Sequence, residues 1–351
     1  MPRFITYAQA ILEAQDQLMS EDPGVFLIGL GVPTPTGVFG TTKNLVSKYG
    51  ENRVLDIPAS ENALTGVAFG ASILGLKPIF IHHRVDFAVL SLEPIVNQAA
   101  KWHYMYGQTM TAPIVIRMII GRGWGQGPQH SQSLQAWFAH IPGLKVLMPT
   151  TAKDAKQLLI AAVKDASPVI ILEHRWLYDL TGDVPEELIA GKIGKANIMV
   201  AGTDLTLVSN SIMSIECVKA ASKLLEYGIS AEVIDLATIK PLDRETIISS
   251  VQKTKNVIVV DNGHLDFGVS AEVISIISEN LFSDLKRAPI RIGLPNIPTP
   301  TSRTLADTFY PDSDTILIKA LELFGKNQDV VIKTSDENFK DVPNKDFKGP
   351  Y

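Results

Sequence analysis

The stretch that decides the fold reads Pro113-Ile114-Val115-Ile116-Arg117-Met118-Ile119-Ile120. It is apolar at nearly every position, whereas a strand with one face in water alternates apolar and polar residues. A strand of this kind is covered on both faces, as strands in parallel sheets are. We therefore expect it to be an inner strand of an α/β domain.

The segments on either side of this stretch alternate between strand and helix patterns. Helices are expected at 6–20, 41–49, 61–76, 91–106, 131–140 and 152–165. Strands are expected at 25–29, at the run ending at Asp56, and at 78–82, 145–149 and 168–173. This alternation predicts a doubly wound parallel sheet.

A second alternation begins near Asn197 and predicts a smaller α/β domain. Its expected strands are 205–209, 231–235, 257–261 and 289–293, and its expected helices are 214–227, 244–254, 269–281 and 314–324. We thus predict a first domain (1–176), an irregular linker (177–196), a second domain (197–333) and a polar tail (334–351). The tail has few large apolar residues and is expected to pack loosely or not at all.

Composition limits the possible classes of protein. The chain has 351 residues, enough for two domains with their own cores. A net charge of −5 and no block of lysine and arginine argue against a nucleic-acid groove. A single cysteine, Cys217, excludes an intramolecular disulfide and a zinc site of several cysteines. We find neither a signal-peptide pattern nor an apolar run of membrane-spanning length, so a cytoplasmic location without membrane contact is expected.

Glu61 stands where the strand ending at Asp56 gives way to a helix of small residues. Open α/β sheets bind ligands at such crossings, so the carboxylate is a candidate acid or base. The alternative is structural: Ser60 has the character of an N-cap, and an acidic residue in the first turn is favoured by the helix dipole.

Two further crossings carry chemically useful side chains. The loop Gly121-Arg122-Gly123-Trp124-Gly125-Gln126-Gly127 leads to His130, but its spacing matches no phosphate-binding fingerprint. His82-His83-Arg84 and Phe87 follow the strand 78–82. Adjacent histidines on a strand point to opposite faces, which argues against a shared metal. Since all three crossings end at one edge of a sheet, we expect a pocket for a cofactor there.

At this point a resemblance becomes plain. The runs Asp56-Ile57-Pro58-Ala59-Ser60-Glu61, Ile95-Val96-Asn97-Gln98-Ala99-Ala100-Lys101, Gln129-His130-Ser131-Gln132-Ser133 and Phe138-Ala139-His140-Ile141-Pro142-Gly143-Leu144 occur in the order typical of one family. The chain resembles, over about residues 4–325, the β subunit of thiamine-diphosphate (ThDP)-dependent 2-oxoacid dehydrogenases of the pyruvate or branched-chain type. The resemblance implies a pyrimidine-binding domain followed by a transketolase C-terminal-type domain.

The resemblance also implies roles for particular residues. Glu61 matches the glutamate that hydrogen-bonds the aminopyrimidine ring and promotes its reactive imino tautomer. Ala59 and Phe87 match residues that contact the pyrimidine, with His83 beside them. His130 matches the histidine on the substrate side of the cofactor. In some members a structural potassium ion lies at the positions of Ala162, Asp165 and Ser167.

A partner is implied as well. The family holds the diphosphate and Mg²⁺ with a Gly-Asp-Gly motif, which this sequence lacks. An α subunit would supply it, most simply in an α₂β₂ assembly, and the pair could join a lipoyl acyltransferase core.

The chain departs from the family pattern at two places. Leu30-Gly31 replaces the usual acidic pair, which puts communication between active sites in doubt. His83 and Arg84 replace glutamine and an apolar residue, which suits a larger, polar or anionic substrate. The alternative is that Arg84 faces solvent or the α subunit.

Three functions follow from these observations. The first is a β subunit of a two-component ThDP enzyme that decarboxylates a 2-oxoacid and transfers the activated aldehyde or acyl group. The second is a split transketolase or acyloin-forming carboligase acting on a polar or sugar substrate. The third is a non-catalytic, regulatory β-like subunit, for which Leu30-Gly31 argues and the joint presence of Glu61, Phe87 and His130 argues against.

Overall fold

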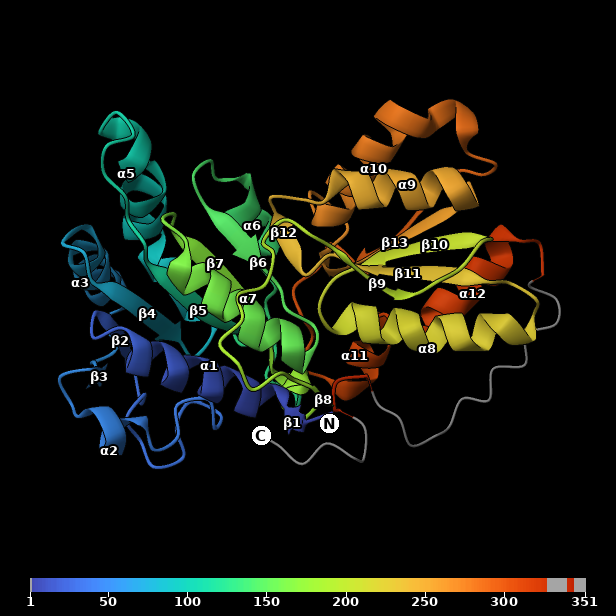
Figure 1. The fold of residues 1–351 in the computed structure, drawn as a ribbon. Coiled ribbons are helices and arrows are strands. Elements are labelled where there is room, and N and C mark those ends of the chain that lie inside the picture. Colours follow the sequence, from blue (N-terminus) through green and yellow to red (C-terminus); the bar gives the residue numbers. More distant parts are fainter. Residues whose placement is uncertain (1, 327–339, 344–351) are drawn as a thin grey trace.

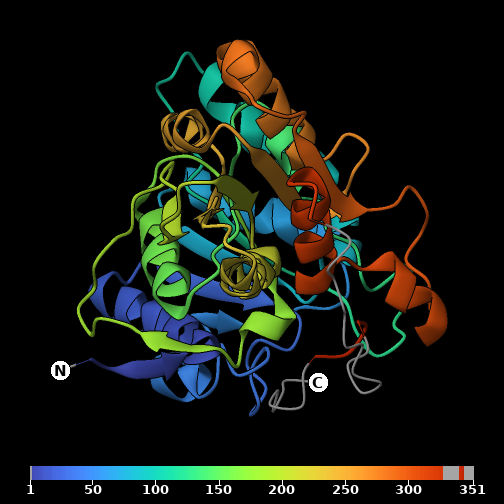
Figure 2. The same cartoon turned by 90° about the vertical axis from the view of Figure 1, so that its right-hand side faces the viewer.

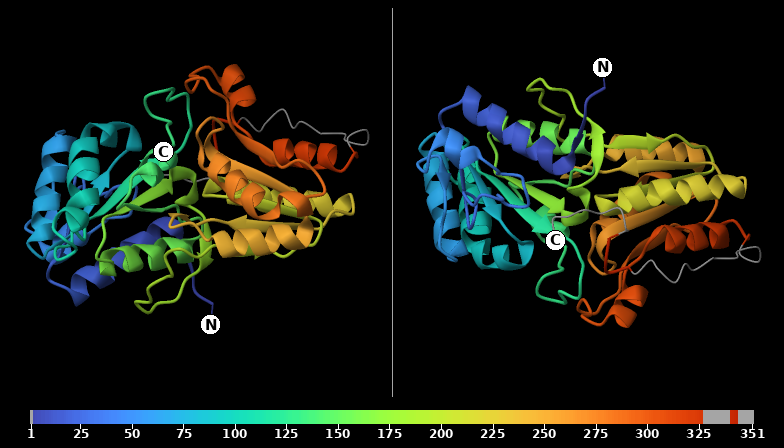
Figure 3. Two further views of the ribbon diagram at one scale, coloured as in Figure 1. Left: turned by 90° about the horizontal axis from the view of Figure 1, so that it is seen from above. Right: turned by 90° about the horizontal axis from the view of Figure 1, so that it is seen from below.

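The computed structural model describes residues 2–326 and 340–343, which form two α/β domains lying side by side (Figure 1). The same two lobes are separate in views from above and below (Figure 3). Viewed along the line that joins them, the second domain lies in front of the first (Figure 2). The predicted fold class is confirmed. Within the described residues, no helix combines the length and the apolarity that crossing a bilayer requires.

The first domain is built on a seven-stranded sheet with the strand order β12-β6-β7-β5-β4-β2-β3. Its strands are β2 (Val25–Gly29), β3 (Val54–Leu55), β4 (Lys77–His82), β5 (Val115–Ile120), β6 (Lys145–Leu147), β7 (Val169–His174) and β12 (Thr238–Lys240). All neighbours pair in parallel except β12, which runs antiparallel to β6. The apolar stretch 113–120 thus contains the central strand β5.

Both faces of β5 are buried, as its composition predicted. Val115 and Ile119 belong to one apolar core, and Ile116 and Met118 belong to a second core on the other face. Helices α1 (Tyr7–Glu21) and α7 (Ala152–Lys164) pack together over the first core. The second core is covered by α3 (Glu61–Ile73), the segments η1 (Val89–Ser91) and η2 (Glu93–Ala99), and α6 (Gln135–His140).

The second domain contains a five-stranded sheet with the order β14-β13-β10-β11-β9. Its strands are β9 (Asn197–Val200), β10 (Leu205–Ser209), β11 (Ala231–Asp235), β13 (Val257–His264) and β14 (Ile290–Leu294). The helices α8 (Ile212–Glu226) and α12 (Ser313–Leu323) lie on one face, and α9 (Arg244–Thr254) and α10 (Val269–Leu281) on the other (Figure 1). A further helix, α11 (Arg303–Phe309), precedes α12 and was not expected.

Three expected helices differ in the structure. The helix expected at 41–49 is limited to α2 (Leu45–Tyr49), because Asn44 adopts a left-handed conformation at φ 65°. The helix expected at 131–140 begins only at Gln135. The helix expected at 91–106 consists of the 3₁₀ segment η1, the π-helix η2 and α5 (Ala100–Met105). π-helical segments often occur at functional sites.

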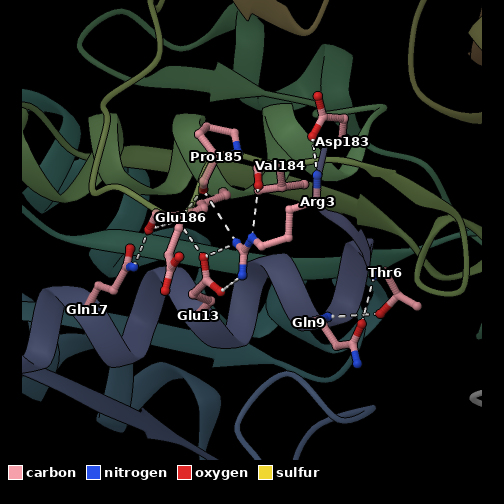
Figure 4. A network of polar contacts seen from close by, with 10 residues as sticks. Arg3, Thr6, Gln9, Glu13, Gln17, Asp183, Val184, Pro185 and Glu186 are labelled. Carbon is pink, nitrogen blue, oxygen red and sulfur yellow. Dashed lines mark hydrogen bonds and ion pairs between the residues drawn. The ribbon is translucent and has the colours of Figure 1, made fainter. Parts of the chain in front are cut away.

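The segment 177–196 is more ordered than an irregular linker. Its strand β8 (Thr181–Asp183) pairs antiparallel with β1 (Phe4–Thr6). Arg3 strengthens this pairing, since its guanidinium donates to Val184 O and forms a two-bond ion pair with Glu13 on α1 (Figure 4). The chain that leaves the first domain is therefore held against that domain.

The two domains share a buried polar junction. Asp235, at the end of β11, accepts hydrogen bonds from Thr150 of the first domain at 2.7 Å and from Ser214 at 2.6 Å. Burial raises the pKa of this carboxyl to about 7, although the two hydroxyl donors oppose the shift. In the folded chain this carboxyl is thus protonated in acid and loses its proton only as the pH rises through about 7.

Asp235→Asn is expected to make the free energy of unfolding less dependent on pH. The folded pKa lies above the unfolded value, so stability from this group is present at low pH and is lost as pH rises from about 4 to about 7. Relative to the native chain, the variant should gain about 2–3 kcal/mol between pH 5 and pH 8. Urea unfolding at both pH values measures this difference. Asp266→Asn, whose side chain is exposed, serves as control, and an equal pH dependence of both variants would contradict the role of Asp235.

Residues 340–343, the described part of the tail, pack more closely than the composition of the tail predicted. Asp341 is buried, its carbonyl oxygen accepts from Trp124 N–H at 2.8 Å, and its carboxylate accepts from Gly125 N–H at 3.3 Å. The polar composition of this segment did not predict the contact, because the oxygens of Asp341 accept from backbone N–H groups of a loop that is distant in the sequence. Apart from residues 340–343, the tail lies outside the described residues.

Candidate active site

The candidate site lies at the carboxyl edge of the first sheet. Strands β3, β4 and β5 end there side by side with β2, and each is followed by one of the predicted site segments. This is the edge at which open α/β sheets bind ligands.

Glu61 is the first residue of α3, and its surroundings favour chemistry over capping. Ser60 makes no side-chain capping hydrogen bond, in contrast to Thr6 and Thr151, which cap α1 and α7. The Glu61 side chain is partly buried and has no hydrogen bond or ion pair within the described part of the chain. Its carboxylate is therefore available to a ligand.

The direction of Glu61 follows from helix geometry. Residues four apart lie on the same helix face, so Glu61 stands one turn before Thr65. Thr65 is buried, donates to Ser91 at 3.0 Å and lies 3.4 Å from Nε2 of His82. This face of α3 thus looks toward the end of β4 and the segment that carries Phe87.

Phe87 and His130 meet although they follow different strands. Their rings form an edge-to-face pair with centroids 5.3 Å apart. Phe87 is 42% exposed, which leaves ring surface for a ligand. Asp86 secures the arrangement, because its carboxylate accepts from both the backbone and the side-chain nitrogen of Gln132.

His82 is the last residue of β4 and His83 follows it, and the two side chains have separate environments, as expected for adjacent residues. His82 is buried against Thr65 and Phe80, and burial lowers its pKa to about 3. His83 lies beside Gly31, and burial lowers its pKa against the opposing effects of Leu30 and Asp56. Its Nε2 atom is buried and has no hydrogen-bond partner among the residues that the structure describes. His83 is thus a neutral group that can receive or donate one further hydrogen bond.

Arg84 is buried and hydrogen-bonded, so the alternative that it faces solvent does not hold. Its guanidinium is buried and donates to Gly121 O at 2.6 Å, to Asp86 at 3.2 Å and to Gln126 at 3.2 Å. Burial lowers its pKa although Asp86 opposes the shift. The sequence could not show this network because its members come from separate strand ends.

The residues present fit the pyrimidine half of ThDP. A carboxylate without a partner, an exposed aromatic ring and a small exposed residue, Ala59, occur together at one sheet edge. Leu30, in place of the family acid, is 45% exposed at the end of β2, and Gly31 donates its N–H to Asp56 at 2.7 Å.

The potassium prediction stays a prediction. Asp165 N–H donates to Ala162 O, and the Asp165 carboxylate accepts from Ser167 N–H at 2.8 Å and pairs with Lys145 at 2.5 Å. Burial raises the pKa of Asp165, but these bonds outweigh it and hold the pKa below its usual value. A lysine ammonium thus already neutralises the carboxylate.

Sequence reasoning missed three residues of this edge, namely Asp86, Gln126 and Arg175. Gln126 accepts from Arg84 and also from Arg175 at 3.0 Å. Arg175 follows β7 directly, so the rule that singled out Glu61 and His130 would have found it.

A cavity of about 1210 Å³ lies elsewhere, between α6 and the start of α10. Residues 133–141 and 263–269 line much of it, and Glu61, Phe87 and His130 do not. We place the site by its chemical groups, because the carboxyl edge holds the unpartnered carboxylate and the exposed ring.

Comparison with known proteins agrees with the architecture. Residues 3–181 match the transketolase pyrimidine-binding domain, and residues 194–316 match the transketolase C-terminal domain. A solved structure described as a split-gene transketolase, an inactive β4 tetramer, aligns with a TM-score of 0.74 over 92% of this chain and 99% of that chain. At 21% identity it supports the fold alone.

Two relatives are much closer in sequence. The acetoin:2,6-dichlorophenolindophenol oxidoreductase subunit beta of Cupriavidus necator is 39% identical, covering 91% of this chain and 97% of the relative. The mitochondrial pyruvate dehydrogenase E1 component subunit beta of Saccharomyces cerevisiae is 39% identical, covering 91% and 88%. By both domain matches and these identities, the chain belongs to the β-subunit family of ThDP-dependent E1-type enzymes.

Proposed function

We propose that this chain is the pyrimidine-binding β subunit of a two-component ThDP enzyme that decarboxylates a 2-oxoacid and transfers the resulting aldehyde or acyl group. The proposal rests on two features at one sheet edge: Glu61, which has no partner among the described residues, and the Phe87–His130 ring pair. Bound ThDP would supply the electron sink that decarboxylation requires.

Each residue has a defined task in this proposal. Glu61 holds a proton at the pyrimidine ring nitrogen, where its partner-free carboxylate is available. Phe87 supports the ring, and Ala59 leaves space beside it. His130 is positioned by its contact with Phe87 and by the Asp86–Gln132 bonds beside it, and it moves protons on the substrate side.

The second component is an α subunit that carries the Gly-Asp-Gly motif and, with it, Mg²⁺. Apolar side chains around the site support such a partner. Leu90 is 65% exposed and comes three residues after Phe87, which is 42% exposed. Exposed apolar residues gathered in one region mark surfaces that are covered in assemblies. We extend the proposal to an α₂β₂ heterotetramer, which could dock on a lipoyl acyltransferase core.

A carboligase or split transketolase is the second candidate. The observation that favours it is the set of buried arginines behind His83, which suits a polar or charged substrate. The two candidates share the cofactor and differ in the acceptor.

Co-expression with an α-type subunit from a neighbouring gene tests the function. We expect the pair to bind ThDP with Mg²⁺ in calorimetry and to decarboxylate 2-oxoacids with an artificial electron acceptor. Transfer to a lipoyl domain would identify a dehydrogenase, and carbon–carbon bond formation with aldehydes a carboligase. An assembled pair that binds no ThDP would refute both enzyme functions and leave the regulatory subunit.

A further inference from the structure

Arginine follows three adjacent strands at the carboxyl edge of the first sheet. Arg84 comes after β4, Arg122 after β5 and Arg175 directly after β7, and these strands are neighbours. All three side chains are buried, with 2% exposure for Arg175. Buried cations without counterions are costly, so their charges require an explanation.

The described carboxylates do not balance these charges. Asp86 pairs with Arg84 at 3.2 Å, whereas Glu173, the nearest acid on β7, forms its ion pair with Arg117. No carboxylate within residues 2–326 and 340–343 forms an ion pair with Arg175. Burial and the charge of Arg84 accordingly lower the pKa of Arg175 to about 10. Burial and the three arginines also hold the pKa of His174 well below its usual value.

Aromatic rings hold Arg175 but do not occupy its hydrogen-bonding edge. Its guanidinium carbon lies 4.5 Å from the centroid of Trp124 and 5.4 Å from that of Phe39. Stacking uses the faces of the guanidinium and leaves the in-plane N–H groups for acceptors. Among the described residues, only Nη1 has an acceptor, the amide oxygen of Gln126, and Nε is buried without one.

Gln126 offers one oxygen to two arginines. Its single amide oxygen accepts from Arg84 at 3.2 Å and from Arg175 at 3.0 Å, so both guanidinium groups reach the same point. Gln126 itself is exposed on the glycine-rich loop, where Gly125 and Gly127 adopt positive φ. Its side chain can therefore turn away from the two guanidinium groups into solvent, and an oxyanion can take the place of its amide oxygen.

This point adjoins the candidate active site. Arg84 binds Asp86, Asp86 binds Gln132, and Phe87 contacts His130. A group held between the two arginines would lie on the side of the site away from α3, because β4, β5 and β7 follow one another in the sheet.

Resting on the proposed function, we propose that Arg84 and Arg175 form a subsite for the oxyanion at the far end of the substrate, a carboxylate or a phosphate monoester. Guanidinium groups bind both anions with paired N–H···O bonds. Arg122 adds positive charge from its place between Trp176 and Tyr310. The enzyme would therefore prefer substrates with a charged end over neutral ones of equal length.

Anion binding is tested first on the full chain, by calorimetry with inorganic phosphate. We expect one saturable site per chain, weakened at least tenfold in Arg175→Met and severalfold tighter in Gln126→Ala, since the competing amide oxygen is gone. Arg287→Met is the matched control, because Arg287 also stacks on a ring, Phe324, and donates to an amide oxygen, that of Asn256. Binding that is absent, or unchanged in Arg175→Met and Gln126→Ala, overturns the subsite.

Substrate choice is tested on the assembled enzyme. Two pairs of compounds differ only in the charged end: 2-oxoglutarate with 2-oxopentanoate, and glyceraldehyde 3-phosphate with glyceraldehyde. Arg175→Met should lower kcat/KM at least tenfold for the charged member of one pair, mainly through KM, and less than twofold for its neutral member. The pair whose charged member loses kcat/KM shows whether the subsite binds a carboxylate or a phosphate. An equal loss for charged and neutral members refutes recognition of the substrate.

The two proposals can fail separately. If the assembled enzyme binds no ThDP while the chain binds phosphate as described, the proposed function fails and the anion site stands. If Arg175→Met does not fold, Arg175→Lys and Gln126→Ala provide the test, since each keeps the charge and alters the hydrogen-bonding edge. Under the proposal these two variants shift phosphate affinity in opposite directions, and any other result contradicts it.

Discussion

Glu61→Gln lowers the turnover of the assembled enzyme by a factor of about 10²–10⁴, the range expected when a positioned acid–base group is removed. The amide keeps the size and polarity of the side chain but cannot hold or release a proton at the pyrimidine nitrogen. The native carboxylate is suited to this task because no described side chain competes for it. Folding should be unaffected, since Ser60 and Glu61 supply no capping hydrogen bond to α3.

The measurement has two parts. Steady-state kinetics with a 2-oxoacid give the loss in kcat, and circular dichroism of the enzyme with bound ThDP reports the tautomers of the aminopyrimidine ring. The tautomer signal should disappear in Glu61→Gln and in Glu61→Ala while both variants still assemble with the α subunit. A native signal in either variant would refute the role of Glu61.

Glu245→Gln is the matched control. Glu245 also lies in the first turn of a helix, α9, and its side chain is 85% exposed. The change in charge is identical, so a similar loss in both variants would point to a general electrostatic effect. We expect native turnover from Glu245→Gln.

Arg117→Met destabilises the first domain by about 3–5 kcal/mol, the usual cost of removing one member of a buried ion pair. Arg117 on β5 donates two bonds to Glu173 on β7, at 2.6 and 2.8 Å, and both side chains are essentially inaccessible. The same guanidinium donates to Gln15 of α1 and to Thr41. Without it, the carboxylate of Glu173 stays buried, and Tyr178 is its one remaining side-chain donor in the part of the chain that the structure describes.

Urea unfolding of the full chain measures this effect through the transition of the first domain. The double variant Arg117→Met/Glu173→Leu removes both charges and should recover more than half of the loss. Arg3→Met is the control, because the Arg3–Glu13 pair is 33% and 24% exposed and should contribute no more than about 1 kcal/mol (Figure 4). Equal losses in Arg117→Met and Arg3→Met would contradict the importance of burial.

Much of the fold could be predicted because it depends on local pattern. The apolar run of β5 requires two covered faces, and both are covered. Helices α9 and α10 begin and end where periodicity predicted. The helix predicted at 41–49 begins only at Leu45, because Asn44 adopts a left-handed conformation. Thr41 is held instead by bonds to Arg117 and Gln15 that no local pattern shows.

The candidate site was predictable for a related reason. Glu61, Phe87 and His130 each follow a strand, and parallel strands bring their ends to one edge whatever the order of the sheet. Residue type and position relative to the strands were therefore enough to group them. The structure adds the contact between the rings of Phe87 and His130, whose centroids lie 5.3 Å apart.

The sequence by itself thus determined the two α/β domains and the edge at which Glu61 and His130 lie, because burial periodicity and strand ends are local properties. The tertiary structure alone decided that Arg84 is buried, that Gln126 joins it to Arg175, and that Asp341 docks on the glycine-rich loop. Gln126 and Arg175 are 49 residues apart, and Gly125 and Asp341 are 216 apart. Such contacts depend on which strands become neighbours and which loops cover them, and sequence pattern carries no record of that order.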